Sequence, residues 1–175
     1  AKLNLESEIP DWNFERVVQQ ANVSWNNTLG KIDIETSDND SRTVFYTSLY
    51  HTFIQPSLAS DIDGRYRTMG HEIKRDTSYT NYTVFSLWDT FRATHPLYTI
   101  ITPKQNQAFI RSLLCKYDES GILPKWELAS NETGTMIGYH AVSVIADAIM
   151  KKQCDFDIKK AIEACIRSSV YDTTN

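Results

Sequence analysis

Apolar residues recur at helical spacing along most of the chain, and this pattern constrains the fold more than any other feature. Glycine at 30 and 121 and proline at 56 and 103 end or separate the segments that carry it. The pattern predicts helices over residues 10–30, 43–55, 84–101, 107–121, 135–150 and 157–170. Neither a sustained heptad seam nor a close sequence repeat is visible, which disfavours a coiled coil and a classical solenoid. We therefore expect an all-α fold built of helical hairpins.

One stretch, near residues 60–83, lacks helical periodicity and is rich in charge and glycine. We expect a short β-hairpin or a long loop there. Long loops inside compact domains are often functional, which makes five of its residues site candidates: Asp61, Asp63, Arg65, Tyr66 and Arg67. An equally supported alternative is a solvated turn at Asp63-Gly64.

Composition excludes several classes of function. The 175 residues are 41% hydrophobic, which suits one globular domain. With 18 basic and 22 acidic residues and no Lys/Arg block, the chain shows no footprint for nucleic acid or for a membrane surface. No apolar run is long enough to span a bilayer, and the first residues do not resemble a signal peptide.

Cysteine and histidine give no sign of a metal site. The three cysteines are scattered, without the spacing of a zinc site or a disulfide framework. The histidines likewise have no partner at metal-ligand spacing. His140 could be a ligand or a general base, but a lone histidine on a helix is more often a packing residue.

Two segments combine tryptophan with carboxylates. FSLWDTFR contains Trp88-Asp89, and GILPKWELASNETGTMIGYH contains Trp126-Glu127 followed by Glu132. Sugars present weakly apolar ring faces and rigid hydroxyls, so their sites pair flat aromatic rings with carboxylates that accept hydrogen bonds. We expect the two segments to contribute to one shared pocket.

Each of these residues also has a structural interpretation. Trp88 could be a core residue, and Asp89, which falls within the predicted helix among apolar neighbours, could pair with Arg92 one turn away. Glu127 and Glu132 could instead favour the start of the following helix.

Three ordered motifs resemble one family: SLYHTFIQPSLASDIDGRYR, FSLWDTFRATHPLYTII and GILPKWELASNETGTMIGYHAVSVIADA. Together they are similar to the first half of the catalytic domain of glycoside hydrolase family 92, over about residues 38–150. The resemblance implies an (α/α) six-hairpin toroid, normally preceded by a β-sandwich domain. It also implies calcium-dependent, inverting removal of terminal α-linked mannose, with α-1,2 linkages expected, from mannans or N-glycans. Such enzymes are usually exported by bacteria to the periplasm or the outside.

The resemblance also implies roles for particular residues. Trp88 and Asp89 would line the subsite of the terminal mannose, and Trp126, Glu127 and Glu132 would lie on a nearby wall. The family motifs expected to carry the general acid and base do not occur in this sequence. No catalytic or metal-binding residue is therefore assigned, and the calcium ligands are expected outside these residues.

We accordingly expect residues 1–175 to be a single partial domain, a fragment of the toroid. Its expected partners are a mannose-containing oligosaccharide, the rest of the toroid and the β-sandwich domain. Exposed apolar faces could also support a homo-oligomer. The alternatives are a non-catalytic carbohydrate-binding or helical assembly module, and a plain helical scaffold with packed tryptophans.

Overall fold

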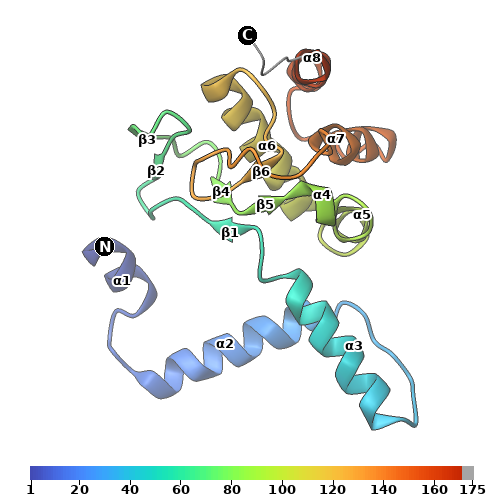
Figure 1. Cartoon of the computed structure of the whole chain (residues 1–175). Coiled ribbons are helices and arrows are strands. Elements are labelled where there is room, and N and C mark those ends of the chain that lie inside the picture. Colours follow the sequence, from blue (N-terminus) through green and yellow to red (C-terminus); the bar gives the residue numbers. More distant parts are fainter. Residues whose placement is uncertain (171–175) are drawn as a thin grey trace. The chain divides into compact units, whose positions relative to one another are not determined.

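The computed structural model describes residues 1–170, which form two compact units that divide after Gln55. The first unit contains three helices: α1 (Lys2–Glu8), α2 (Phe14–Leu29) and α3 (Asn39–Thr52) (Figure 1). The helices predicted over residues 10–30 and 43–55 are confirmed as α2 and α3, although α3 begins a turn earlier.

Side-chain caps determine where α2 and α3 begin. The Asn13 side chain accepts the backbone N–H of Arg16 at 2.9 Å, and the Asp38 carboxylate accepts two backbone N–H groups at the start of α3. The two helices pack through Trp25 and Tyr50, whose ring centroids are 4.6 Å apart.

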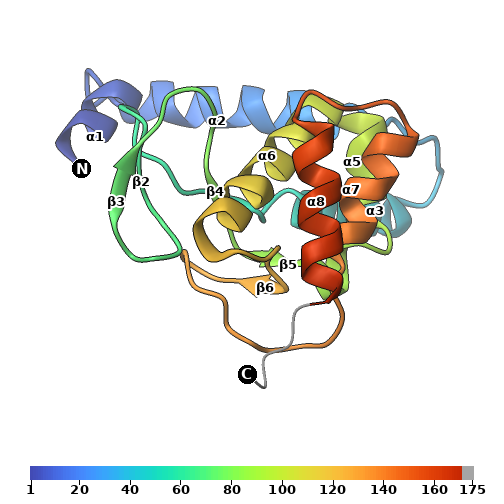
Figure 2. The same cartoon turned by 90° about the horizontal axis from the view of Figure 1, so that it is seen from above.

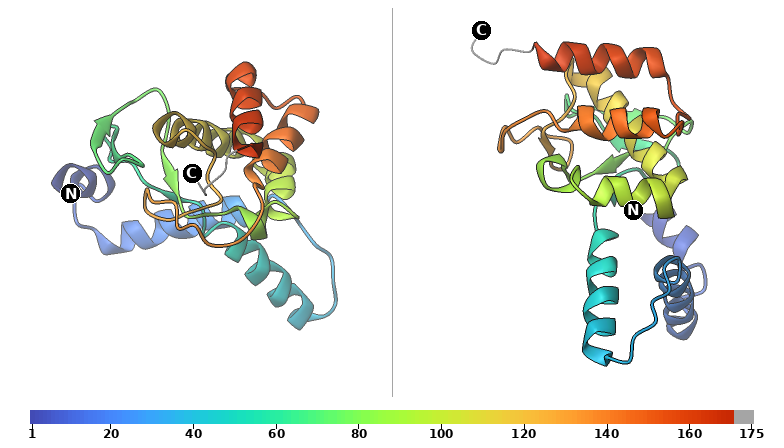
Figure 3. Two further views of the ribbon diagram at one scale, coloured as in Figure 1. Left: turned by 45° about the horizontal axis from the view of Figure 1, so that its top comes forward. Right: turned by 90° about the vertical axis from the view of Figure 1, so that its right-hand side faces the viewer.

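Four longer helices form the core of the second unit. They are α5 (Thr94–Ile101), α6 (Pro103–Ser120), α7 (Ala141–Met150) and α8 (Ile158–Ser169). Helix α6 contacts the other three (Figure 2), and the right-hand view of Figure 3 shows α8, α7 and α5 stacked in that order. The interior between them is filled by fully buried aliphatic side chains, among them Ile110, Leu113 and Ile145.

Three short antiparallel strand pairs lie beside these helices. β1 (Ser57–Leu58) pairs with β4 (Tyr82–Thr83), β2 (Arg65–Arg67) with β3 (Ile73–Arg75), and β5 (Phe85–Ser86) with β6 (Trp126–Glu127). The β2–β3 pair confirms the hairpin predicted near residues 60–83. Gly64 is required at its base, because its φ is 81° and a Cβ atom there would lie 2.5 Å from the carbonyl oxygen of Asp76.

Two helix boundaries were predicted wrongly. Residues 84–101 are not one helix: they form β5, the single turn α4 (Leu87–Thr90) and then α5. The helix predicted from residue 135 begins at Ala141, because the preceding segment includes Met136 and Gly138 at φ values of 65° and 82°. Left-handed residues of this kind interrupt an α-helix.

Candidate functional site

The β5–β6 pair brings together the two tryptophan-containing segments. Ser86 lies opposite Trp126 and Phe85 opposite Glu127 in antiparallel register. Because α4 follows β5 directly, Trp88 and Asp89 are carried on the turn next to this pair. The predicted proximity of the two segments is thus present at the level of the backbone.

The carboxylate of Asp89 is exposed on α4, not buried in a helix as its apolar neighbours suggested. One of its oxygens accepts the hydroxyl of Ser86 at 2.5 Å. The expected alternative, an ion pair with Arg92, is not found among the described residues. The Arg92 guanidinium lies instead over the rings of Trp88 and Phe91, at 5.3 and 5.0 Å from their centroids. Asp89 is therefore open to a ligand, next to a half-buried tryptophan.

His140 belongs to the same surface, although the sequence favoured a packing role within a helix. It lies at the N-cap position of α7, and its ring stacks on Phe91 with centroids 4.0 Å apart and planes 6° apart. Gly138 permits this placement, because a Cβ atom there would approach the His140 ring nitrogen Nε2 to 2.5 Å. Phe91 thus contacts both the Arg92 guanidinium and the His140 ring, and Arg92 also lies over Trp88.

Glu127 is completely buried, and its carboxylate is bonded within the protein. It accepts the backbone N–H of Ser130 at 2.6 Å and that of Val84 at 3.1 Å. The hydroxyl of Thr83 lies 2.9 and 3.1 Å from its two oxygens, and the ammonium of Lys116 lies 3.3 Å from Oε1. The carboxylate therefore joins the end of β4, the loop after β6 and helix α6.

Two of the backbone donors to Glu127 lie in strained conformations. Val84 has a φ of 66° and Ser130 a φ of 63°, a region that a β-branched residue such as valine rarely adopts. Strain of this kind persists only where surrounding contacts hold it. Glu127 supplies such contacts, so it fixes the shape of the chain on both sides of β5–β6.

Lys116 was not predicted as part of this site. It is only 2% exposed, and besides Glu127 it reaches the Asn81 side-chain oxygen at 3.5 Å. The sequence did contain a signal, because Lys116 shares the helical phase of the apolar residues Phe109 and Leu113. A lysine in an apolar phase needs a buried partner, but the sequence could not say which one.

Glu132 holds the loop after β6 from the other end. Its carboxylate accepts the backbone N–H groups of Lys125, Trp126 and Gly134 at 2.8, 3.3 and 3.0 Å. Neither Glu127 nor Glu132 lies in the first turn of α7, so the helix-capping alternative is wrong for both. Trp126 is half-buried, and its carbonyl accepts the Thr133 hydroxyl at 2.9 Å.

Some of the candidate site residues predicted in the hairpin are bonded within the protein, and others lie at the surface. Asp63 pairs with Arg65 at 2.8 Å, and this hydrogen bond lowers the pKa of the Asp63 carboxyl. Tyr66 is buried, with its hydroxyl 3.1 Å from the Glu119 carboxylate. Asp61, Arg65 and Arg67 line a shallow hollow of about 320 Å³.

Within residues 1–170, no three His, Cys, Asp or Glu side chains are arranged to hold a metal ion. Calcium needs six to eight oxygen ligands, and the hairpin offers no such group within these residues: its Asp63 carboxylate is paired with Arg65. In the same part of the chain, no helix combines the length and the apolar character needed to cross a membrane.

The model of the glycosyl hydrolase family 92 catalytic domain matches residues 1–175. The chain belongs to glycoside hydrolase family 92. This match is longer than the range of residues 38–150 that the sequence motifs indicated, because it also includes α1, α2 and α8. No curated protein matches the chain.

Solved structures of the family support the same assignment. A GH92 α-mannosidase from Bacteroides thetaiotaomicron matches with a TM-score of 0.94 and 38% identity over 100% of this chain. The same α-mannosidase in complex with mannoimidazole also gives 0.94 and 38%. An inverting GH92 mannosidase from that organism gives 0.92 and 30%, again over 100% of this chain.

The chain spans about a quarter of the length of these solved relatives, 24%, 23% and 24% respectively. Family 92 catalytic domains are α/α toroids, which confirms the predicted fold class: a set of helical hairpins that corresponds to part of such a toroid.

Proposed function

We propose that this chain supplies part of the mannose-binding surface of a GH92 α-mannosidase, as one partial domain of its catalytic toroid. The observation that carries the proposal is the match over the whole chain to an α-mannosidase that was solved with mannoimidazole, a mannose-like ligand by its name. The exposed Asp89 beside Trp88 gives that surface a carboxylate for sugar hydroxyls and a ring for stacking. The reaction would remove terminal α-linked mannose, with α-1,2 linkages expected, from mannans or N-glycans.

In this proposal the residues divide into two roles. Trp88, Asp89 and Trp126 contact the mannose. Direct contact by Glu127 or Glu132 remains a prediction, and it would require their carboxylates to exchange bonds to the backbone that they now make. Their contribution in the present geometry is to hold β6, which carries Trp126, and the loop that follows it.

Single-displacement inverting hydrolysis needs a general acid and a general base whose carboxyl groups are roughly 6.5–9.5 Å apart, so that a water molecule fits between base and sugar. Asp89 is one open carboxylate next to β5–β6, while those of Glu127 and Glu132 are bonded internally. The acid, the base and the calcium ligands would therefore come from residues outside this chain. Calcium, when bound, would supply a fixed positive charge that binds oxygen atoms of the protein and of the substrate.

Helix α8 offers the surface through which other parts of such an enzyme would pack. Ile158, Ile162 and Ile166 repeat every four residues along it and are 41%, 50% and 61% exposed. We propose that another hairpin of the toroid covers this stripe in the parent enzyme, with a β-sandwich domain as a further partner. A second copy of the chain is the alternative occupant, which sedimentation at several concentrations would reveal as a dimer. Export to the periplasm or the outside of a bacterium is part of the same proposal.

A non-catalytic carbohydrate-binding role is the second candidate, and the internal bonding of Glu127 and Glu132 favours it for the chain alone. The test is to incubate the purified chain with an aryl α-mannoside and with α-1,2-mannobiose, with and without calcium. We expect no release of mannose from the folded chain. Calcium-dependent release would show that these residues contain an acid–base pair and would contradict the division of roles given above.

A further inference from the structure

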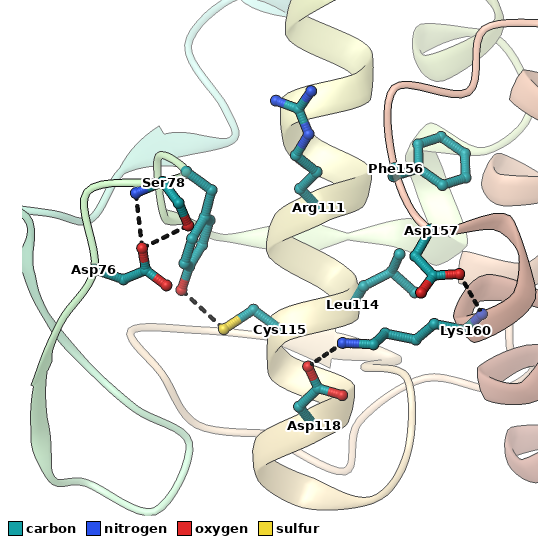
Figure 4. Close-up of a pocket in the computed structure, with 10 residues that line it drawn as sticks. Asp76, Ser78, Arg111, Leu114, Cys115, Asp118, Phe156, Asp157 and Lys160 are labelled. Atoms are coloured by element: carbon teal, nitrogen blue, oxygen red, sulfur yellow. Dashed lines mark hydrogen bonds and ion pairs between the residues drawn. The ribbon is translucent and has the colours of Figure 1, made fainter.

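The second unit contains a hollow of about 340 Å³ beside α6, and the proposed mannose site uses none of its residues (Figure 4). This volume lies at the lower end of the range for small-molecule sites. The walls come from the turn after β3, from α6 and from the start of α8. Their principal side chains are Asp76, Tyr79, Arg111, Asp118, Phe156 and Lys160.

Bonds between different segments hold these walls in place. The Lys160 ammonium of α8 pairs with the Asp118 carboxylate of α6 at 2.7 Å, as Figure 4 shows. The Tyr79 hydroxyl donates to the Cys115 sulfur at 2.8 Å and so fixes the turn to α6. A hollow whose walls are linked by such bonds needs less ordering when a ligand enters, which lowers the entropic cost of binding.

The rim offers hydrogen-bond acceptors from three carboxylates. Oδ1 of Asp76 accepts the backbone N–H of Ser78, and Oδ1 of Asp157 accepts the backbone N–H of Lys160. Oδ2 of Asp118 accepts a hydrogen bond from the Lys160 ammonium. The second oxygen of each has no hydrogen-bond donor among the described residues. These free oxygens suit a ligand with several hydroxyl donors.

The two cations at the hollow are already paired within the protein. Arg111 binds the backbone oxygen and the carboxylate of Asp155, and Lys160 binds Asp118. An anionic ligand would meet the three carboxylates and no unpaired cation, so the charges disfavour it. A metal ion is also disfavoured, because residues 1–170 hold no suitable group of ligands.

The interior of the hollow is partly apolar, with Phe156, Leu114 and Tyr79 among its lining. Flat or aliphatic surface next to carboxylate oxygens matches a pyranose ring, which has C–H faces and equatorial hydroxyls. We propose that this hollow is a second carbohydrate-binding site that takes one pyranose unit, separate from the surface at Trp88 and Asp89. The proposal does not depend on the mannosidase assignment.

The test is a titration of the ¹⁵N-labelled chain with methyl α-mannopyranoside, followed by the amide shifts of every residue. We expect saturable shifts in residues 76–79, 111–118 and 156–160. Phe156→Leu keeps an apolar side chain but removes the flat ring, and it should raise the Kd of these shifts about fivefold. Asp118→Asn removes one charged acceptor and should raise that Kd by a similar factor.

Asp147→Asn is the matched control, because Asp147 forms the same kind of Lys–Asp pair with Lys151, at 2.8 Å, outside the hollow. It should change the Kd by less than about twofold. The amide spectrum of each variant also reports whether it is folded. The proposal is overturned if the sugar leaves the amides around the hollow unmoved, or if Phe156→Leu and Asp118→Asn bind as the unmodified chain does. Because the rim carries three carboxylates, the polycation spermidine is titrated in parallel. Shifts around the hollow that spermidine produces and the sugar does not would overturn the proposal as well.

Discussion

Replacing Lys116 by methionine should destabilise the second unit by several kilocalories per mole. The ammonium lies 3.3 Å from Glu127 Oε1, and the two side chains are only 2% and 0% exposed. Lys116→Met keeps the aliphatic stem but leaves the Glu127 charge buried without its cation. Removing one partner of a buried pair typically costs about 3–5 kcal/mol, and we expect a value near the lower end because three protein donors to Glu127 remain.

The control is Lys160→Met, which removes a lysine from a pair that is partly exposed to solvent. Lys160 and Asp118 are 39% and 47% exposed at a distance of 2.7 Å. Exposed pairs of this kind contribute about 0–1 kcal/mol. The difference between the two substitutions isolates burial, because both remove one ammonium group and keep the stem.

Urea unfolding followed by circular dichroism measures the free-energy change, and amide hydrogen exchange along α6 assigns it to the second unit. A double-mutant cycle with Glu127→Gln should give a coupling energy of about 1–3 kcal/mol, since the double variant leaves no buried unpaired charge. A loss below about 1 kcal/mol for Lys116→Met, equal to that of Lys160→Met, would refute the view that this pair is buried and structural.

Three further predictions concern other parts of the chain. Burial lowers the pKa of His95 to about 4 from its usual 6.5, so between these pH values the unfolded chain binds a proton that the folded chain does not. The free energy of unfolding should be highest above about pH 6.5 and fall by about 3 kcal/mol toward pH 4. Urea midpoints measured across this range should lose the pH dependence in His95→Gln. Gly121 ends α6 at a φ of 81°, and a Cβ atom at this position would meet open space. Gly121→Ala should therefore cost only about 1 kcal/mol of backbone strain, measured in thermal melts. A loss of several kilocalories per mole would mean that the site is crowded. Ile162→Glu places a charge on the exposed stripe of α8, so it should leave the melting temperature of a monomeric chain nearly unchanged while abolishing any dimer seen in sedimentation.

Local sequence signals predicted the helices whose ends carry their own caps. Helix α6 starts at Pro103, one turn before the predicted residue 107, and ends before Gly121 as predicted. Helix α8 begins after Asp157, whose side chain accepts the N–H of Lys160. Each of these signals acts within one turn of the chain, so a single sequence contains it.

The strand before α4 could not be found in the same way. Phe85 and Ser86 lie in an apolar run typical of a helix, but they pair with residues some 40 positions later in the chain. Such a long-range partner overrides local propensity, and only the fold reveals it.

The candidate site shows the same limit. Residue types predicted that the segments of Trp88-Asp89 and Trp126-Glu127 would contribute to one pocket, and the β5–β6 register brings the two segments together by pairing Ser86 with Trp126. A shared sugar site remains a prediction. The sequence could not show that the Glu127 carboxylate is bonded internally, because its donors come from β4, the following loop and α6.

The central claim is that the surface at Trp88 and Asp89, next to β6, binds mannose. Its most direct test is a titration of the ¹⁵N-labelled chain with mannoimidazole, the ligand of the solved α-mannosidase relative. The account predicts amide shifts in residues 86–92 and 126–134 that are lost in Asp89→Asn, a variant that keeps the size of the side chain. A folded chain whose amides in those two segments stay unmoved, or whose shifts persist unchanged in Asp89→Asn, would contradict it.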